Sequence, residues 1–262
     1  MSAFTNKVVW ITGASSGIGE ELAYQLNAQG AKLVLSARRE SELNRVAAKC
    51  NEAIVLPLDL GDLNNAENLT QQVLDKYGAI DFLINNGGNS QRATADETNM
   101  DVVRSILEVN FFGAVKLTKA VLPQMKNKGS GHIVVVSSIA GKFGFYLRSS
   151  YSAAKHALHG YFDSLRLEEE NNGINVTIVC PGKIQTNVSI NAVTADGSEH
   201  GVMDRSQGEL GMPVKECVQQ LIKGVEQKKE ELLIGNKEIL AVHIRRISQR
   251  LFNKIIRKQS PF

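Results

Sequence analysis

The stretch "KVVWITGASSGIG" (Lys7–Gly19) sets the architecture of this chain. It begins with apolar, mostly β-branched residues at consecutive positions, a pattern typical of a strand that is covered on both faces. Gly13, Gly17 and Gly19 follow at once, and a helix is expected to begin near Ile18. Glycine permits a tight turn and a close approach of a ligand to the backbone. The stretch therefore predicts a strand, a glycine turn and a helix in succession.

Further apolar runs repeat the pattern. Strands are predicted, after Lys7–Thr12, at Lys32–Ala37, Ala53–Leu58, Ile80–Asn85, His132–Ser138, Ile174–Cys180 and Glu231–Gly235. The segments between them are long enough for crossover helices. Repeated β-α units predict an α/β fold, a doubly wound parallel sheet of about seven strands with helices on both faces. No linker or repeat interrupts the chain, so residues 1–262 are predicted to form a single Rossmann-like domain.

Composition excludes several classes of protein. The length of 262 residues suits one large α/β domain, and a net charge of +3 is too small to indicate a nucleic-acid partner. Cys50, Cys180 and Cys217 are widely spaced, so neither a disulfide framework nor a zinc site is indicated, and a reducing compartment is favoured. No signal peptide, N-terminal membrane anchor or bilayer-spanning run is expected. A cytoplasmic protein is predicted.

The glycine turn is a candidate phosphate site. A helix N-terminus offers free N–H groups and the positive end of its dipole to a pyrophosphate. The spacing is G-x-x-x-G-x-G rather than the G-x-G-x-x-G of longer dinucleotide domains. The turn could be purely structural, but its place at the first β-α junction favours cofactor binding.

The end of the second predicted strand bears on the choice of cofactor. An acidic residue near this point commonly holds the ribose 2′-hydroxyl of NAD, whereas an arginine accommodates the 2′-phosphate of NADP. Here Ala37 stands at the acidic position, and Arg38 and Arg39 follow. The alternative is a solvated pair of arginines on a loop. NADP(H) is favoured over NAD(H).

A tyrosine and a lysine stand one helical turn apart in "SSYSAAKHAL". Residues i and i+4 of a helix have Cβ atoms about 5–6 Å apart, so Lys155 is expected to lie beside Tyr151. A neighbouring cation favours the phenolate and lowers the pKa of the tyrosine, which would make it an acid/base group near neutral pH. Taken alone, such a pair also arises by chance.

Together these motifs resemble the short-chain dehydrogenase/reductase family, from about Lys7 to Gly235. "TGASSGIG" is similar to its cofactor motif, "NNGG" to its N-N-A-G, and "PGKIQT" to the segment that holds the nicotinamide carboxamide. The resemblance implies four catalytic residues, which are Asn110, Ser138, Tyr151 and Lys155. It implies that the cofactor is bound by Gly13, Ser15, Ser16, Gly17, Ile18, Gly19, Arg38, Asp59, Leu60, Asn86, Gly87, Tyr151, Lys155, Pro181, Gly182, Ile184 and Thr186.

The resemblance also implies a role for each catalytic residue. Tyr151 would exchange a proton with a carbonyl oxygen, and Ser138 would donate a hydrogen bond to the same oxygen. Lys155 would hold the nicotinamide ribose as well as lower the pKa of Tyr151. Asn110 would hold a water that connects Lys155 to solvent.

A closer resemblance is to the dehydrogenase/reductase member 7 and 7B branch of the family. It is carried by "NNGGNSQR" and by the C-terminal segment. The chain departs from the family pattern at Gly87, where alanine is usual. Glycine costs roughly 0.5–1 kcal/mol more backbone entropy than alanine, so a slightly looser turn is expected there.

Two segments are expected to choose the substrate. Residues 187–213 are polar and glycine-containing, and long irregular segments in compact domains are often binding loops; we call this segment the substrate loop. Residues 144–148 precede Tyr151 and are expected to line the opposite wall. Phe145 and Tyr146 there suggest an apolar substrate body, and Arg148 is predicted either to meet an anionic group or to be exposed.

The C-terminal segment, residues 236–262, is basic and amphipathic. Its apolar residues recur at helical spacing among many basic ones, and they are Leu240, Ile244, Ile247, Leu251 and Ile255. Such a helix can lie on an anionic membrane surface. The alternative is packing on its own domain or on a second subunit.

The remaining signals concern packing. The stripe of Ala154, Leu158, Phe162 and Leu165 is predicted to be core, and the family's equivalent helix commonly joins subunits, which implies a homodimer or homotetramer.

His156 and His159 lie three apart without an evident third ligand, so no metal site is predicted.

Three interpretations of function follow. The favoured one is an NADP(H)-dependent oxidoreductase that reduces a ketone or aldehyde. A reductase of a lipid-derived ketone at a membrane surface shares the chemistry and differs in the role of the C-terminal segment. A non-catalytic nucleotide-binding scaffold is disfavoured because the tyrosine and the lysine are both present.

Overall fold

A computed structural model describes residues 2–260, and within this range seven parallel strands form one sheet, in the order β3-β2-β1-β4-β5-β6-β7. The strands are β1 (Val8–Thr12), β2 (Lys32–Ser36), β3 (Ala53–Val55), β4 (Phe82–Asn85), β5 (Gly131–Val136), β6 (Ile174–Pro181) and β7 (Glu231–Ile234). The predicted fold class is confirmed. Position 1 of the predicted domain, and positions 261 and 262 of the C-terminal segment, lie outside the described residues.

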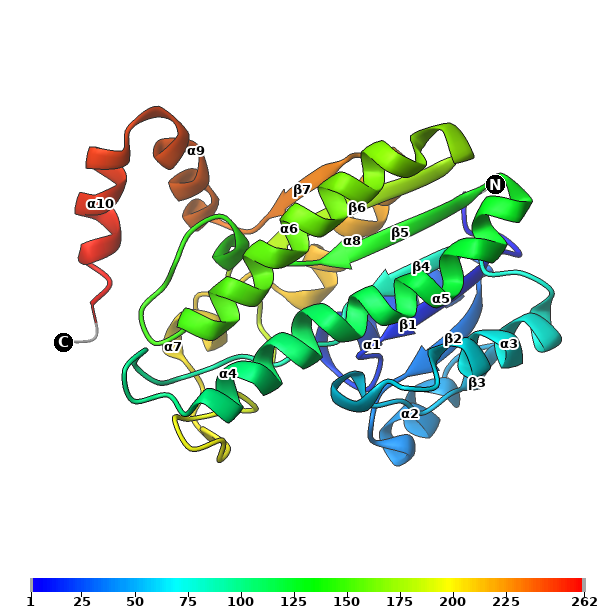
Figure 1. Cartoon of the computed structure of the whole chain (residues 1–262), viewed down its shortest axis with the longest axis horizontal. Coiled ribbons are helices and arrows are strands. Elements are labelled where there is room, and N and C mark those ends of the chain that lie inside the picture. Colours follow the sequence, from blue (N-terminus) through cyan, green and yellow to red (C-terminus); the bar gives the residue numbers. More distant parts are fainter. Residues whose placement is uncertain (1, 261–262) are drawn as a thin grey trace.

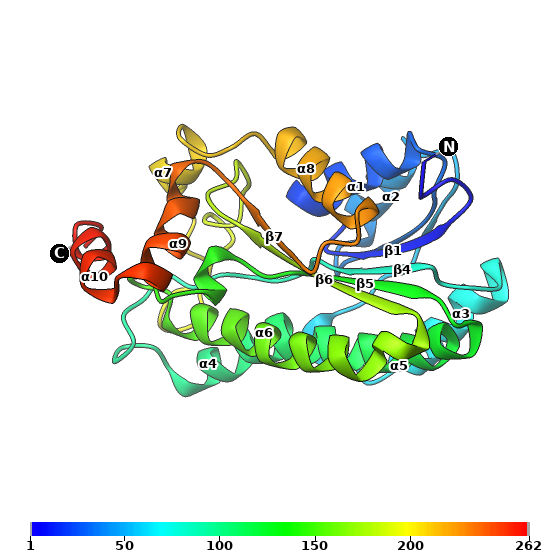
Figure 2. The same ribbon diagram turned by 90° about the horizontal axis from the view of Figure 1, so that it is seen from above.

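Helices cover both faces of the sheet (Figures 1 and 2). One face carries α1, α2 and α8, and the other carries α3, α5 and α6. The helices are α1 (Gly17–Asn27), α2 (Glu40–Ala47), α3 (Ala66–Tyr77), α4 (Met100–Leu107), α5 (Gly113–Lys128), α6 (Ser149–Glu169), α7 (Arg205–Gly208), α8 (Val214–Glu226), α9 (Leu240–Ile247) and α10 (Gln249–Arg257). The predicted stripe of α6 is buried in the core, as expected.

Burial on both faces explains the continuous apolar strands. Every residue of β1 is buried, and the one polar group of Trp10 is satisfied because its indole N–H donates to Ser36 Oγ at 2.8 Å. The third strand is shorter than the predicted Ala53–Leu58 and ends at Val55. Beyond Val55 the chain still runs beside β2, because the N–H groups of Leu56 and Leu58 donate to the Leu35 and Ala37 carbonyls at 3.0 and 3.2 Å. Pro57 lies between these two donors on the edge strand of the sheet, where a missing N–H costs no ladder hydrogen bond.

The strand order indicates where in the sheet a ligand crevice should lie. β1 pairs with β2 on one side and with β4 on the other, so the chain direction across the sheet reverses between β1 and β4. In open α/β sheets a ligand binds outside the carboxyl ends of the strands at such a switch point. The glycine turn that follows β1 therefore lies at the mouth of this crevice.

The substrate loop is tied to the body of the domain at both ends. Val193 forms a β-bridge with Gln91, and Met212 forms one with Ile184. The loop contains the short helix α7, which its sequence pattern did not predict. The first bridge holds the loop against the segment that follows β4, and the second joins the end of the loop to the segment that follows β6.

The C-terminal segment forms two helices rather than one. Ser248 has extended backbone dihedral angles, ends α9, and accepts a hydrogen bond from the Leu251 N–H at 3.2 Å as the N-cap of α10. The break changes which apolar residues face inward. Val242 and Phe252 pack against Phe143, while Leu240, Ile247 and Leu251 of the predicted stripe are 59%, 87% and 50% exposed.

Across residues 2–260, none of the helices combines the length and apolar character needed to cross a bilayer.

Candidate active site

A cleft of about 1030 Å³ opens at the carboxyl edge of the sheet. Its wall runs from the glycine turn after β1, past the ends of β4, β5 and β6, to the substrate loop. All four predicted catalytic residues line it, and so does every predicted cofactor-binding residue except Gly19. The cleft thus brings together residues from positions 13 to 186 of the chain.

The glycine turn forms a cradle at one end of the cleft. Gly13 and Gly17 have φ values of +65° and +57°, which favour glycine. Ser16 is the N-cap of α1, and its side chain makes no capping hydrogen bond, so N–H groups of the first turn of α1 are left for a ligand. This geometry fits the pyrophosphate of a dinucleotide.

Gly19 has a different role from the one predicted. A Cβ at this position would lie 2.2 Å from the Gly13 carbonyl oxygen. The residue therefore lies behind the turn, where the absence of a side chain lets α1 pack against it.

The cleft continues to a polar end beyond β2. The side chains of Arg38 and Arg39 line the wall and are exposed. Asp59, which lines the same end, accepts a hydrogen bond from the Gly61 N–H at 2.8 Å. The two guanidiniums have no hydrogen-bond or ion-pair partner among residues 2–260, so both are available to a ligand at this end.

The turn after β4 is more tightly held than the sequence suggested. The N–H groups of Asn86 and Gly87 both donate to Thr12 Oγ1, at 3.0 and 2.9 Å. A Cβ at Gly87 would lie 2.6 Å from Leu60 Cδ1. The expected looser turn is wrong, because glycine here allows close packing between two walls of the cleft.

Ser138 and Tyr151 meet at the centre of the cleft. Ser138 ends the segment after β5, and its hydroxyl accepts from the Ala140 N–H at 3.1 Å and donates to the Pro181 carbonyl at 3.4 Å. Tyr151 lies in the first turn of α6 and is hydrogen-bonded to Ser138. The two hydroxyls can therefore reach one substrate oxygen.

Burial raises the pKa of Tyr151, against the opposing effects of the Ser138 hydrogen bond and of the Arg148 and Arg92 charges. Lys155 is buried, and its ammonium donates to the Val136 carbonyl at 2.9 Å. Burial lowers the pKa of Lys155 to about 8. The prediction that Lys155 lowers the pKa of Tyr151 is therefore wrong for this structure: burial dominates, and the cations that oppose it are the two arginines.

Asn110 lies in a π-helical turn, Glu108–Phe112, between α4 and α5. Its amide N–H groups donate to the Ile106 carbonyl and to Asn89 Oδ1, each at 2.9 Å. Its Oδ1 atom is buried and has no hydrogen-bond partner among residues 2–260. A buried acceptor of this kind fits a bound water or hydroxyl group.

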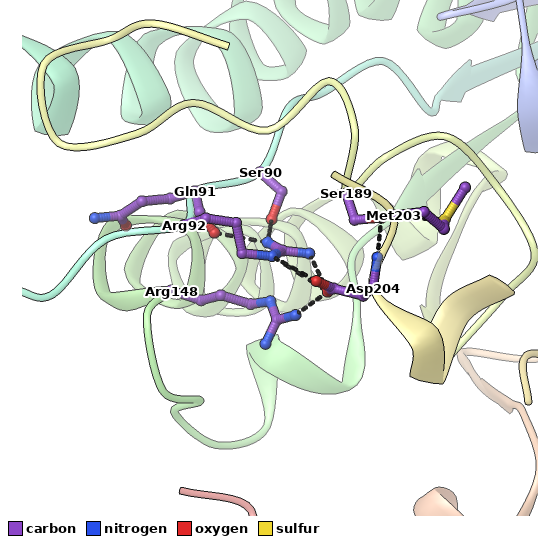
Figure 3. A network of polar contacts seen from close by, with 7 residues as sticks. All are labelled: Ser90, Gln91, Arg92, Arg148, Ser189, Met203 and Asp204. Atoms are coloured by element: carbon purple, nitrogen blue, oxygen red, sulfur yellow. Dashed lines mark hydrogen bonds and ion pairs between the residues drawn. The ribbon is translucent and has the colours of Figure 1, made fainter. Parts of the chain in front are cut away.

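The structure adds two residues that sequence reasoning did not single out. Arg92 and Asp204 line the cleft beside Arg148 and form a network with it (Figure 3). Arg92 and Asp204 are 112 positions apart, so no local spacing could have indicated the pair.

A second polar cluster lies under α6. The ligand atoms of His159, Cys180 and Glu231 lie within 4.8 Å of one another. Lys142 donates to Glu231, and its ammonium also lies 3.2 Å from His159 Nδ1. Burial lowers the pKa of His159 to about 4 and raises the pKa of Cys180 to about 12. We assign no metal to this cluster, because the ammonium already contacts two of the three groups.

Comparison with known proteins gives consistent matches. The sequence model of the family described as short chain dehydrogenase matches residues 7–197. Dehydrogenase/reductase SDR family member 7B of Mus musculus is 42% identical over 260 residues, which cover 96% of this chain and 80% of that protein. Dehydrogenase/reductase SDR family member 7 of Homo sapiens is 42% identical over 247 residues, which cover 91% and 73%.

Solved structures agree in fold. A short-chain dehydrogenase from Streptomyces avermitilis superposes with a TM-score of 0.81 at 31% identity, covering 98% of this chain and all of that one. A short chain dehydrogenase/reductase from Burkholderia phymatum, solved in complex with NAD, gives a TM-score of 0.82 at 24% identity, with 96% of each chain covered.

Proposed function

This chain belongs to the short-chain dehydrogenase family, in the branch of the member 7 and 7B proteins, and from that premise we propose that it is an NADP(H)-dependent carbonyl reductase. It would transfer hydride between the nicotinamide and a ketone or aldehyde, and the reverse reaction would oxidise the alcohol. One observation carries this proposal: Tyr151, Ser138, Lys155 and Asn110 line the same cleft as the glycine turn of α1.

The residues at the centre of the cleft would handle the proton. A bound nicotinamide supplies the hydride, and the protein supplies orientation and electrostatics. The Tyr151 hydroxyl would donate its proton to the carbonyl oxygen, and its raised pKa keeps the phenol protonated until charge develops on that oxygen. Ser138 would donate a hydrogen bond to the same oxygen and stabilise the developing charge.

Lys155 and Asn110 would return the proton to Tyr151. With its pKa near neutrality, Lys155 can give up and regain a proton within the physiological range. Asn110 Oδ1 offers a buried acceptor for a water that leads toward solvent. By family resemblance, Lys155 would also hold the ribose hydroxyls of the nicotinamide.

The preference for NADP(H) rests on the polar end of the cleft. Ala37 has no carboxylate to accept a hydrogen bond from a ribose 2′-hydroxyl. The Arg38 guanidinium lines the cleft beside it and would donate hydrogen bonds to a 2′-phosphate. Both features favour the phosphorylated cofactor.

The proposal is tested by following the oxidation of NADPH and NADH with a panel of ketones, aldehydes and acyl-chain carbonyls. We expect consumption of NADPH with at least one carbonyl and a higher kcat/KM for NADPH than for NADH. No carbonyl-dependent oxidation of either cofactor would contradict the proposed reaction, and an equal or greater kcat/KM for NADH would contradict the cofactor preference alone.

A second candidate function is reduction of a lipid-derived ketone at a membrane surface. The observation that favours it is the exposure of Leu240, Ile247 and Leu251 on helices that also carry Arg245, Arg246, Arg250, Lys254 and Arg257. Exposed apolar side chains among basic ones suit the surface of an anionic bilayer. A cytoplasmic protein with peripheral membrane contact would satisfy both candidates.

A homodimer or homotetramer is also proposed. Phe112 and Leu167 are large apolar residues exposed at the start of α5 and near the end of α6. Light scattering after size-exclusion chromatography measures the oligomer directly, and a monomer would contradict this proposal.

A further inference from the structure

Two guanidiniums converge on one carboxylate at the rim of the cleft (Figure 3). Arg92 Nε and Nη2 donate to Asp204 Oδ2 at 3.2 and 2.7 Å, and Arg148 Nη2 donates to the same oxygen at 2.7 Å. Two positive charges therefore face one negative charge. The group carries one excess positive charge on the wall where the substrate is expected.

The two arginines differ in how fully they are bonded. The side chain of Arg92 is only 4% exposed, and its remaining nitrogen, Nη1, donates to Ser90 Oγ at 2.8 Å and to the Gln91 carbonyl at 2.6 Å. Every donor nitrogen of Arg92 thus has a protein partner. Arg92 is a structural arginine that holds Asp204 in place.

Arg148, by contrast, has hydrogen-bond donors without a protein partner in the described part of the chain. Its side chain is 24% exposed, and its Nε and Nη1 atoms have no hydrogen-bond partner among residues 2–260. The ring of Phe145 lies 5.9 Å from the centre of the guanidinium, so an apolar surface lies beside the donors that remain. The planar fork of arginine is suited to a carboxylate or phosphate.

Arg148 is also close to the reacting group. It is the N-cap residue of α6, and Tyr151 follows three positions later in the first turn of that helix. Both residues line the cleft, and the charge of Arg148 acts on Tyr151 to oppose the rise in its pKa. One small molecule that carries both an anionic group and a carbonyl is therefore suited to contact Arg148 and Tyr151 together.

We propose that Arg148 binds an anionic group, a carboxylate or a phosphate, on the carbonyl substrate through its Nε and Nη1 atoms, while Asp204 of the substrate loop, held by Arg92, positions the guanidinium through Nη2. The inference rests on the proposed reductase function and narrows its substrate class. Asp204 directly precedes α7, and its N–H donates to Ser189 Oγ at 3.1 Å, so its carboxylate belongs to the loop. Glu199 also lines the cleft, but it is exposed to water.

The test compares levulinate, its uncharged methyl ester and acetonyl phosphate as substrates of the full-length protein with NADPH. In Arg148→Gln we expect kcat/KM for the two anions to fall about ten- to hundredfold, the range of a lost charged hydrogen bond. The ester should change by much less, so the ratio of kcat/KM for anion to ester is the readout. Arg104→Gln is the matched control, because Arg104 is an exposed arginine of α4 that does not line the cleft. The relative response of levulinate and acetonyl phosphate distinguishes a carboxylate from a phosphate.

Binding is measured separately, by calorimetry of levulinate and methyl levulinate with the wild-type and Arg148→Gln proteins saturated with NADPH. Preferential loss of levulinate binding in Arg148→Gln supports the proposal even if no turnover occurs, and absent turnover then contradicts the reductase function alone. Equal affinity for acid and ester in the wild type, or an unchanged ratio in Arg148→Gln, overturns the role of Arg148 and leaves the reductase function standing.

Discussion

The ammonium of Lys155 lies over the ring of Tyr151, 5.6 Å from its centroid, and donates its hydrogen bond to the Val136 carbonyl rather than to the tyrosine hydroxyl. The pair lies one helical turn apart in α6, as the sequence predicts. Its contact is with the π face of the ring, so Lys155 does not act on the phenol through a hydrogen bond. In this arrangement burial raises the pKa of the Tyr151 hydroxyl, while Ser138 and the two arginines, Arg92 and Arg148, act to lower it.

Tyr151→Phe should lose nearly all turnover and keep cofactor binding. The change removes the proton donor, and a well-placed acid contributes about 10²- to 10⁴-fold in rate. Steady-state kinetics and a fluorescence titration with NADPH measure the two effects. Tyr161→Phe, which removes a phenol elsewhere on α6, is the control. Unchanged turnover in Tyr151→Phe would exclude this tyrosine as the acid.

The pH dependence of kcat/KM for carbonyl reduction should follow the protonation state of Lys155. Because burial places its pKa at about 8, Lys155 in the free protein is mostly charged below that pH and mostly neutral above it. We expect kcat/KM for carbonyl reduction to fall as the pH rises through this value, since that parameter follows the free enzyme. In Lys155→Arg, which stays charged, the residual activity should lack this fall. A profile of the wild type that is flat from about pH 7 to about pH 9 would contradict the assignment.

Arg38→Gln should weaken the binding of NADPH much more than the binding of NADH. Loss of a guanidinium that pairs with the 2′-phosphate should raise the Kd of NADPH about ten- to hundredfold. The Kd of NADH, which has no such phosphate, should hardly change. Arg39→Gln, at the neighbouring exposed arginine, gives the comparison. An equal loss of affinity for both cofactors in Arg38→Gln would mean that the residue does not select NADP(H).

Gly88→Ala should disturb the catalytic centre without replacing any of its residues. A Cβ at Gly88 would lie 2.5 Å from Asn110 Oδ1 and 3.6 Å from Lys155 Nζ, so Asn110 must shift. Displacement of positioned groups lowers rates strongly, and we expect kcat to fall about tenfold or more. Gly160→Ala is the control, because a Cβ there meets nothing within 4 Å and Gly160 does not line the cleft. Equal activity of both variants would show that the position of Asn110 does not matter to turnover.

The exposed apolar residues of the C-terminal helices should decide membrane contact. Replacing Leu240, Ile247 and Leu251 with serine removes side chains that the domain does not bury, so the fold should persist. If these residues enter a bilayer, flotation with vesicles of anionic phospholipid should fall about tenfold or more. Met100→Ser, at an exposed methionine of α4, is the control for loss of an exposed apolar side chain elsewhere on the domain. Truncation after Gly235 is a poorer test, because it also removes Phe252 from its contact with Phe143. Equal flotation of the triple variant and the wild type would remove the membrane proposal.

By itself, the sequence determined the sheet, the glycine turn and the helical register of the catalytic pair. Strands covered on both faces must be continuous apolar runs, and seven such runs alternate with helical segments. The positive φ angles of Gly13 and Gly17 follow from a turn that other residues rarely adopt. The four-residue spacing of Tyr151 and Lys155 places them on one face of α6. All of these are local consequences of backbone geometry.

Only the tertiary structure decided what surrounds those groups. The direction of the Lys155 ammonium depends on the Val136 carbonyl at the end of β5, and the pKa of Tyr151 depends on how completely distant segments exclude water. The pairing of Arg92 with Asp204 spans 112 positions and depends on where the substrate loop folds back. Side-chain partners and desolvation arise from contacts between segments far apart in the chain, and no local period in a sequence encodes them.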